Sequence, residues 1–141
     1  LIQAGIPVFI SDVSTITQSL DLINRLGEIG GFTKKAQELV HIISEGFKSI
    51  SLLEKQPKAL YLIWKEPYMA AGTDTYISDL MSHLGIDNVM STWGERGFRY
   101  PEVDSDQIKA LEPDFILLSS EPYPFKEKHR ELICKTLGIP T

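Results

Sequence analysis

Aromatic side chains gather in the second half of the sequence, and their types and spacing suit a large flat ligand with apolar surface. Most of the 2 Trp, 5 Tyr and 6 Phe residues fall between residues 64 and 125. Such rings bury much area at a small entropic cost and commonly line ligand pockets. The alternative is that they pin loops against a sheet edge. The residues that we expect to form a rim around such a ligand are Trp64, Tyr68, Trp93, Phe98, Tyr100, Tyr123 and Phe125. Of these, Trp93, Phe98 and Tyr100 lie in a loop that also holds Gly94 and Gly97.

Catalytic patterns are weaker. The three histidines, His41, His83 and His129, fall in expected helices without a metal-ligand spacing such as His-Glu-x-x-His. The Ser119-Ser120-Glu121 segment follows a strand but lacks the Gly-x-Ser-x-Gly turn that exposes a nucleophile. The glycines of residues 27–31 lie between helices, so they indicate a helix break rather than a phosphate loop. Gly72-Thr73-Asp74 opens a helix and suits either an anionic ligand edge or a plain N-cap.

Composition limits the class of protein. The chain has 141 residues, of which 43% are hydrophobic and 23% charged, which is ordinary for one globular domain or one lobe of a larger protein. Its formal net charge of −5 disfavours nucleic acid as a partner. No apolar run reaches the roughly 18–20 residues of a membrane-spanning helix. The N-terminus shows no signal pattern, but signals are removed on export, so this does not place the protein in the cytoplasm.

The first part of the chain predicts a strand and two helices. The apolar run of residues 8–10 precedes helical spacing at Ile16, Leu20, Ile23 and Leu26. After the glycines, Thr33 can cap a long helix that we expect over residues 33–56 and that Pro57 stops. At 1.5 Å per residue such a helix is about 30 Å long and would serve as a spine.

Beyond residue 57 the pattern alternates between strands and helices. Continuous apolar runs at 59–64 and 114–118 indicate buried strands, and residues 88–90 form a weaker one. Helices are expected after Thr73 or Asp74 with Gly85 as the C-terminal stop, after Ser105, and over 126–137 with Gly138 as the stop. This order predicts an α/β, Rossmann-like lobe with a mostly parallel sheet flanked by helices.

One short pattern occurs near both ends of the chain. Gly5-Ile6-Pro7 and Gly138-Ile139-Pro140 each read as a helix exit followed by a strand entry. We therefore expect two similar lobes, of which only the second is nearly complete: an inter-lobe junction with a short helix (1–32), the long helix (33–56) and a truncated C-terminal α/β lobe (57–141). Missing neighbours would expose apolar surface and sheet edges, which favours self-association or a swapped dimer.

Specific segments resemble the second lobe of periplasmic metal-chelate receptors, the substrate-binding proteins of ABC importers for vitamin B12, ferric siderophores and haem. The matching segments are WKEPYMAAGTDTYI at 64–77, LG at 84–85, NV at 88–89, RYPEV at 99–103 and LEPDFIL at 111–117. GIPVF at 5–9, LG at 26–27 and the expected long helix are similar to the junction and rigid backbone helix of that family.

The resemblance implies a two-lobed protein with a shallow cleft that binds a chelate outside the inner membrane and delivers it to a permease dimer. It would be periplasmic or a membrane-anchored lipoprotein without a cofactor, and its ligand would be a corrinoid, a ferric siderophore or haem. No His, Met or Tyr spacing in the sequence establishes direct coordination of iron or cobalt. The resemblance and the aromatic rim together give the ligand-binding set Trp64, Tyr68, Met69, Gly72, Trp93, Phe98, Arg99, Tyr100 and Tyr123. Asp106 matches the carboxylate that docks on basic permease residues.

Two other classes stay open on the sequence. One is a small α/β enzyme with carboxylates such as Asp74 or Glu121 at the strand ends, and the other is a partner-binding fragment. An enzyme needs a base within hydrogen-bond reach of a group that orients it, whereas a chelate receptor needs aromatic rings and a few cations. Aromatic residues dominate, so a binding protein that is not an enzyme is the favoured interpretation.

Overall fold

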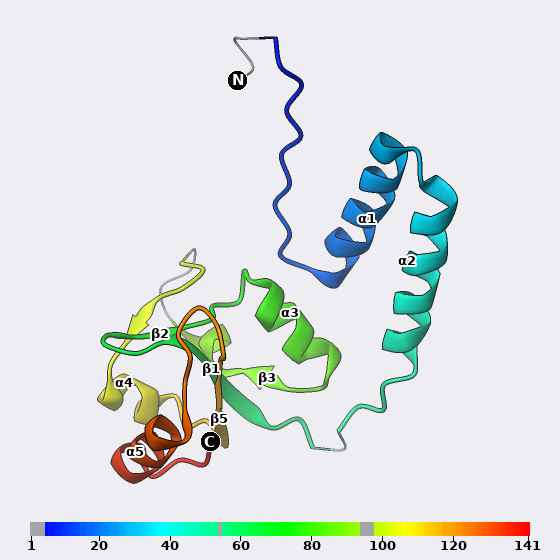
Figure 1. Cartoon of the computed structure of the whole chain (residues 1–141). Helices are drawn as coiled ribbons and strands as arrows, with labels where there is room; N and C mark the ends of the chain where they lie inside the picture. The colour runs from blue at the N-terminus through cyan, green and yellow to red at the C-terminus, as the bar shows by residue number, and fades with distance from the viewer. Residues whose placement is uncertain (1–4, 54, 94–97) are drawn as a thin grey trace.

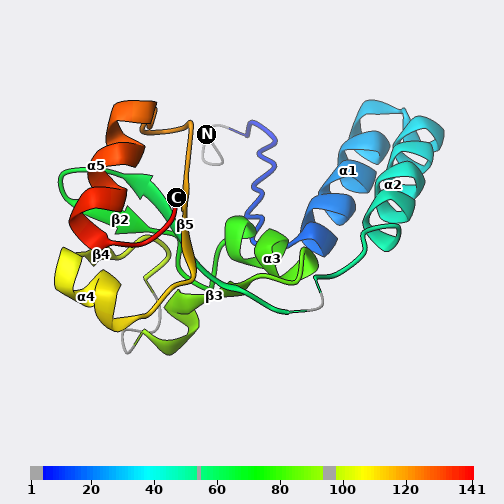
Figure 2. The ribbon, with the colours of Figure 1, turned by 90° about the horizontal axis from the view of Figure 1, so that it is seen from below.

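The chain folds into a helical hairpin and an α/β lobe. We describe them from a computed structural model, in which residues 5–53, 55–93 and 98–141 are described. Figure 1 shows the hairpin of α1 (Ile16–Gly30) and α2 (Thr33–Lys48) standing apart from the sheet. Seen from below in Figure 2, α3 (Tyr76–His83) lies between the hairpin and the sheet, while α4 (Ser105–Ala110) and α5 (Glu127–Leu137) lie at the opposite end.

Local capping explains both ends of α1. The Thr15 side chain accepts the Gln18 N–H at the N-terminus, and Gly31 adopts a left-handed conformation (φ 73°) at the C-terminus. Gly27 lies where α1 meets α2, and a Cβ there would collide with the Cβ of Ala36. The hairpin therefore closes through small residues, and Gly27 stays within the helix instead of breaking it.

The expected helix over residues 33–56 is wrong in its extent. The helix ends at Lys48, where the Ser49 N–H donates to the Glu45 carbonyl and Ser49 Oγ donates to the Gly46 carbonyl, so these carbonyls of the last turn have partners. Leaving the helix also brings Leu52 against Gly85 at the end of α3. Sixteen residues span about 24 Å. Phe32, not Thr33, occupies the N-cap position, without a side-chain hydrogen bond.

Within the described residues, five strands form one curled mixed sheet. β1 (Lys58–Trp64) pairs in parallel with β3 (Asp87–Asn88) on one side and with β5 (Phe115–Leu118) on the other. β2 (Tyr68–Ala70) folds back antiparallel on β1, and β4 (Glu102–Val103) pairs antiparallel with β2. The predicted α/β class is confirmed. The parallel part is the one predicted, but the segment after Trp64, for which no strand was predicted, returns as β2 in a tight β-hairpin that adds antiparallel pairing.

Caps and ends of the lobe's helices differ slightly from the sequence-based expectation. Thr75, rather than Thr73 or Asp74, caps α3 by accepting the Ser78 N–H. Asp104 instead of Ser105 caps α4, in a reciprocal capping box with Gln107. The stops were predicted correctly, since Gly85 and Gly138 both have φ 72°. Residues 89–92 form a 3-10 helix (η2, Val89–Thr92) where a strand was expected, because the Asn88 side chain accepts the Met90 N–H and turns the chain.

The core lies between the sheet and the helices of the lobe. Leu60 and Leu62 of β1 and Ile116 of β5 pack with Ile108 of α4 and Ile133 of α5. A buried polar network supports the other side, where Asn88 Nδ2 donates to the Ala71 carbonyl and to Ser78 Oγ. This core fixes the ends of β1 and β5, from which the candidate site is built.

The expected strand at residues 8–10 is not a strand in the structure. The segment is extended and exposed, and among the described residues no strand pairs with it. At the other end, the Pro140 carbonyl accepts the Ile116 N–H of β5. The predicted strand entry after Gly138 therefore lies beside the sheet, although it is not itself a strand.

Candidate ligand-binding site

An aromatic cluster forms where β1 and β5 end. Trp64 is the last residue of β1, and Tyr123 and Phe125 lie in the segment after β5. The Trp64 and Tyr123 rings meet edge to face with centroids 5.4 Å apart, and the Tyr123 and Phe125 centroids are 4.7 Å apart. Because β1 and β5 are parallel neighbours, their carboxyl ends share one sheet edge, which is where open α/β sheets bind ligands.

The segment that carries Tyr123 is held by its own backbone. The Phe125 N–H donates to the carbonyls of Ser119 (3.3 Å) and Tyr123 (2.9 Å), and Ser119 Oγ donates to the Tyr123 carbonyl. Trp64 keeps 38% of its surface exposed, whereas Tyr123 and Phe125 are half-buried. The cluster is therefore a supported aromatic surface with one open face.

His129 of α5 completes this cluster. Its ring centroid lies 5.4 Å from that of Tyr123 and 6.1 Å from that of Phe125. Its Nδ1 accepts the Lys126 backbone N–H (3.0 Å), and its Nε2 lies 3.5 Å from Tyr123 Oη. Partial burial lowers the pKa of His129, and the positive charges of Lys128, Lys65 and Lys126 lower it further, against an opposing effect of Glu66. The imidazole is therefore neutral at neutral pH.

Charged groups border the cluster in pairs. Lys65 Nζ binds Glu66 Oε1 at 2.8 Å, which raises the pKa of Lys65 and lowers that of Glu66. Arg130 Nε donates to Glu127 Oε1 at 2.8 Å, and this bond lowers the pKa of Glu127. An open hollow of about 220 Å³ adjoins Phe125; it is lined by Leu118, Ser119, Ser120, Phe125, Lys126, Glu127 and Arg130. An apolar surface bordered by cations and hydroxyls suits a ligand with an apolar face and polar edges.

Three other predicted ligand-binding residues lie in the β1–β2 hairpin or against the hydrophobic core. Tyr68 begins β2 and, like Trp93, is partly buried against the hydrophobic core. Met69 pairs with Trp64 across the β1–β2 hairpin and is half-buried. The structure thus gives Tyr68 and Trp93 a packing role, and ligand contact by these three residues stays a prediction.

Gly72 and Arg99 build a clasp between the lobe and the segment that leads into α1. The Gly72 N–H donates to the Arg99 carbonyl at 2.8 Å, and a Cβ on Gly72 would lie 2.5 Å from the Phe98 carbonyl oxygen. The Arg99 guanidinium donates to the Asp74 carbonyl, to Asp12 Oδ1 (3.1 Å) and to Ser14 Oγ (3.0 Å). These contacts occupy Arg99, so its structural role is clear while its predicted ligand role stays untested.

Phe98 and Tyr100 flank Arg99 and are both exposed. None of the described contacts joins either ring to the cluster around Trp64, and Gly94 and Gly97 of the same predicted loop lie outside the described residues. Asp106 is the second residue of α4, as predicted, and is exposed. Asp104 makes the cap, and none of the described hydrogen bonds or ion pairs involves the Asp106 carboxylate.

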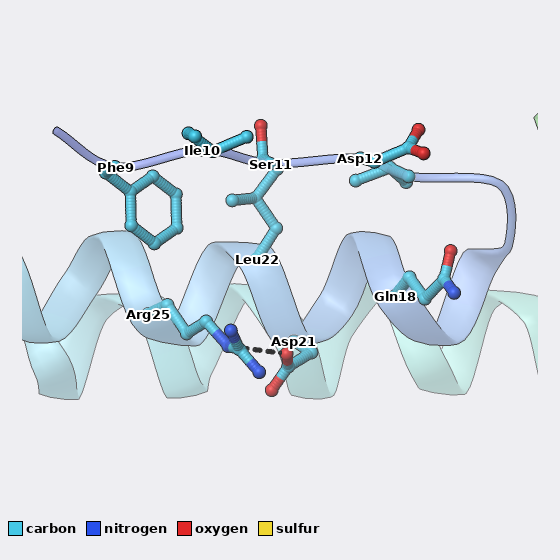
Figure 3. A pocket seen from close by; sticks show the side chains of 9 residues that line it. Phe9, Ile10, Ser11, Asp12, Gln18, Asp21, Leu22 and Arg25 are labelled. Carbon is cyan, nitrogen blue, oxygen red and sulfur yellow. Dashed lines mark ion pairs between the residues drawn. The ribbon is translucent and has the colours of Figure 1, made fainter.

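A separate hollow lies along helix α1 of the helical hairpin rather than at the sheet edge. Figure 3 shows it between the extended segment at Phe9 and helix α1, with Phe9 pointing toward the helix, Leu22 pointing toward the segment, and Arg25 paired to Asp21 at 2.7 Å. It measures about 240 Å³. One wall is a strand-like segment that pairs with none of the described strands, so we place the candidate site at the aromatic cluster.

The part of the chain that the structure describes contains neither a cluster of metal ligands nor a helix that could span a membrane. No group of three or more His, Cys, Asp or Glu side chains is arranged there to hold a metal ion. None of the described helices combines the length and the apolar character needed to cross a membrane.

Comparison with known proteins identifies the family. The family model described as "Periplasmic binding protein" matches residues 1–133, nearly the whole chain. The chain belongs to the periplasmic binding protein family. The resemblance inferred from the sequence is thus confirmed at this level. Among curated proteins, none matches the sequence.

Several solved structures share the fold. An ABC transporter substrate-binding protein from Listeria monocytogenes EGD-e matches with a TM-score of 0.76 at 19% identity, over 95% of this chain and 53% of that one. The periplasmic heme binding protein HutB of Vibrio cholerae matches with a TM-score of 0.76 at 20% identity, over 97% and 54%. The vitamin B12 binding protein BtuF of Vibrio cholerae matches with 0.67 at 18%, over 84% and 46%. The chain spans about half the length of these structures.

Sequence reasoning overlooked His129, which it noted only as a histidine of an expected helix without a metal-ligand spacing. A signal was present, since His129 stands three residues after Lys126, at the position where a capping-box side chain accepts the N-cap N–H. Phe125 was named among the rim aromatics but not in the ligand-binding set, although its ring contacts both Tyr123 and His129.

Proposed function

We propose that this chain is part of the substrate-binding component of an ABC importer and captures a metal chelate outside the inner membrane, as a periplasmic or lipid-anchored protein. The observation that carries the proposal is the open aromatic cluster of Trp64, Tyr123 and Phe125 at the carboxyl ends of β1 and β5, in a chain of the periplasmic binding protein family. Aromatic faces stack on flat macrocycles and on aromatic chelators with large apolar contact.

The ligands of two similar proteins support the ligand class. HutB is described as heme-binding and BtuF as binding vitamin B12, and both ligands are large metal macrocycles. The predicted enzyme alternative gains no support, because within the described residues neither Asp74 nor Glu121 has a side-chain hydrogen bond to a base. A binding protein that is not an enzyme remains the favoured function, and no observation favours a second.

Tryptophan emission tests chelate binding, because the chain has only two Trp residues. In a Trp93→Phe variant, the remaining Trp64 reports on the cluster, and we expect haemin, cyanocobalamin or ferrichrome to quench its emission with saturation. A Trp64→Phe variant is the matched control and should show weaker quenching. Tyr123→Ala should weaken binding by about 1–3 kcal/mol, as loss of a buried aromatic contact does, and Tyr100→Ala should do the same only if Tyr100 also contacts the ligand. Unchanged Trp64 emission with all three chelates would rule the proposal out.

Docking on the permease dimer is the second half of the proposed function. A free carboxylate at Asp106 can pair with Arg on the permease and orient the docked protein. We expect Asp106→Arg to bind chelate normally but to stimulate the transporter's ATPase poorly in proteoliposomes. Asp106→Asn should be weaker in its effect, and Asp104→Asn would separate docking from loss of the α4 cap. Normal stimulation by the Arg variant would place docking elsewhere.

A further inference from the structure

His129 connects the start of a helix to the aromatic cluster. Lys126 occupies the N-cap of α5, and its side chain carries only donors, so it cannot cap the helix itself. The His129 ring supplies the acceptor instead, through Nδ1 and the Lys126 N–H. The same ring lies against Tyr123 and Phe125. One side chain therefore fixes both the first turn of α5 and the two rings that precede it.

These contacts require one protonation state. A ring nitrogen that accepts a backbone N–H carries no proton, so the proton of the neutral imidazole is on Nε2, facing Tyr123 Oη at 3.5 Å. Protonation adds a hydrogen to Nδ1. The Lys126 N–H and the new Nδ1–H then point at each other, and the cap is lost.

We propose that His129 is a positioning residue that holds Tyr123 and Phe125 in their ligand-binding arrangement only while its imidazole is neutral, so that chelate binding weakens in acid. This inference rests on the proposed function, because it concerns the regulation of the same site. His129 acts through the two rings and not through contact with the metal.

The surrounding charges favour the neutral form. The cations that face His129 are Lys126 at the N-cap of α5, Lys128 of α5 and Lys65 of the β1–β2 turn, while Glu66 of that turn opposes them. The Tyr123 hydroxyl faces Nε2. Since burial and these cations lower the pKa of His129 in the folded chain, the unfolded chain binds the proton more tightly. The stabilising contribution is therefore complete above the unfolded value of about 6.5 and is lost as the pH falls through it toward the lowered native value.

Nuclear magnetic resonance of the ligand-free chain tests the mechanism directly. Nitrogen shifts of the His129 ring should show the Nε2–H tautomer at about pH 8, with a midpoint below about 6.5. The Lys126 amide signal should change with the same midpoint, because its hydrogen bond is lost on protonation. An Nδ1–H tautomer, or a Lys126 amide that does not follow His129, would overturn the inference whatever the ligand result.

Two variants separate the cap from the ring. His129→Gln keeps an acceptor at the usual capping-box position but cannot titrate, and His129→Phe keeps a ring but has no acceptor. We expect chelate affinity of the unmodified chain to fall about fivefold from about pH 8 to about pH 5, the size of one lost helix-cap hydrogen bond. The Gln variant should bind equally at both values, and the Phe variant should be weak at both. Equal acid loss in the Gln variant would contradict the proposal.

Failure of the proposed function gives a different result. If haemin, cyanocobalamin and ferrichrome all fail to bind at about pH 8, the chelate-binding proposal and the ligand part of this inference are both overturned. The ring and amide titrations then still decide whether neutral His129 positions the cluster. If a chelate binds and its affinity is the same at both pH values, only the His129 inference is overturned.

Discussion

The α/β lobe and the α1–α2 hairpin use similar apolar residues with opposite results. In the lobe, Leu60 and Ile116 are fully buried, because sheet and helices enclose them. In the hairpin, the buried residues are Ile16, Gly27 and Ala36, while large apolar side chains such as Ile42 remain 67% exposed. An amphipathic pattern thus forms a helix, but burial depends on a partner surface. In the lobe, the sheet and the helices cover each other's apolar faces. In the α1–α2 hairpin, each helix is covered mainly on the one face that packs against the other helix.

The largest expected difference between the two regions is in side-chain truncation. Leu60→Ala should destabilise the chain by about 2–5 kcal/mol, because it leaves a cavity in a packed core. Ile42→Ala in the hairpin should change the free energy of unfolding by less than about 0.5 kcal/mol, since most of the side chain is already in water. Urea denaturation followed by circular dichroism measures both. Similar losses for the two variants would show that the hairpin face is covered in solution.

Glycine substitutions should sharpen the same contrast. Gly72→Ala places a Cβ against the Phe98 and Arg99 carbonyls and should cost about 1–3 kcal/mol. Gly46→Ala in α2 meets nothing within 4 Å and should stabilise the helix by about 0.5–1 kcal/mol. Thermal unfolding of each variant gives the sign. A neutral Gly72→Ala would mean that residues 98 and 99 can move away, and the clasp would then be loose.

The smallest expected effect is on the chain's self-association. Leu26, Phe32 and Leu39 line an apolar groove on the hairpin, and we expect a second copy to cover it weakly as concentration rises. Sedimentation velocity should show association of the unmodified chain and a monomer for a Leu26→Lys, Leu39→Glu variant. Leu132→Lys on α5, also an exposed site, is the matched control. A monomer at every concentration without the substitutions would contradict this expectation.

Most of the local structure was predictable. The apolar runs that became β1 and β5 and the glycine stops of α3 and α5 depend on neighbouring residues alone. The end of α2 was not predictable in the same way, because the chain after the helix packs Leu52 against Gly85, a contact between residues far apart in the sequence. The antiparallel return of β2 was also missed, since Pro67 and the polar residues beside it read as a loop.

The sequence predicted the aromatic character of the candidate site better than it predicted which residues form it. Position at a strand end sufficed to select Trp64 and Tyr123, which the structure places in contact. The same reasoning selected Trp93, which is partly buried against the core, because a loop aromatic can turn inward or outward without any change in the local pattern. His129 was missed because its helix position resembles that of an ordinary surface residue.

The sequence by itself determined the class of fold, the parallel strands β1 and β5, the helices of the lobe, and the end of the sheet at which aromatic side chains would gather. These follow from periodicity, capping residues and chain direction, all of which act over a few residues. Only the tertiary structure decided that Arg99 binds Asp12, a contact between residues 87 positions apart, and that His129 supports Tyr123. The physical reason is that long-range contacts depend on how packed elements meet, and packing selects among many pairings that the local sequence permits equally.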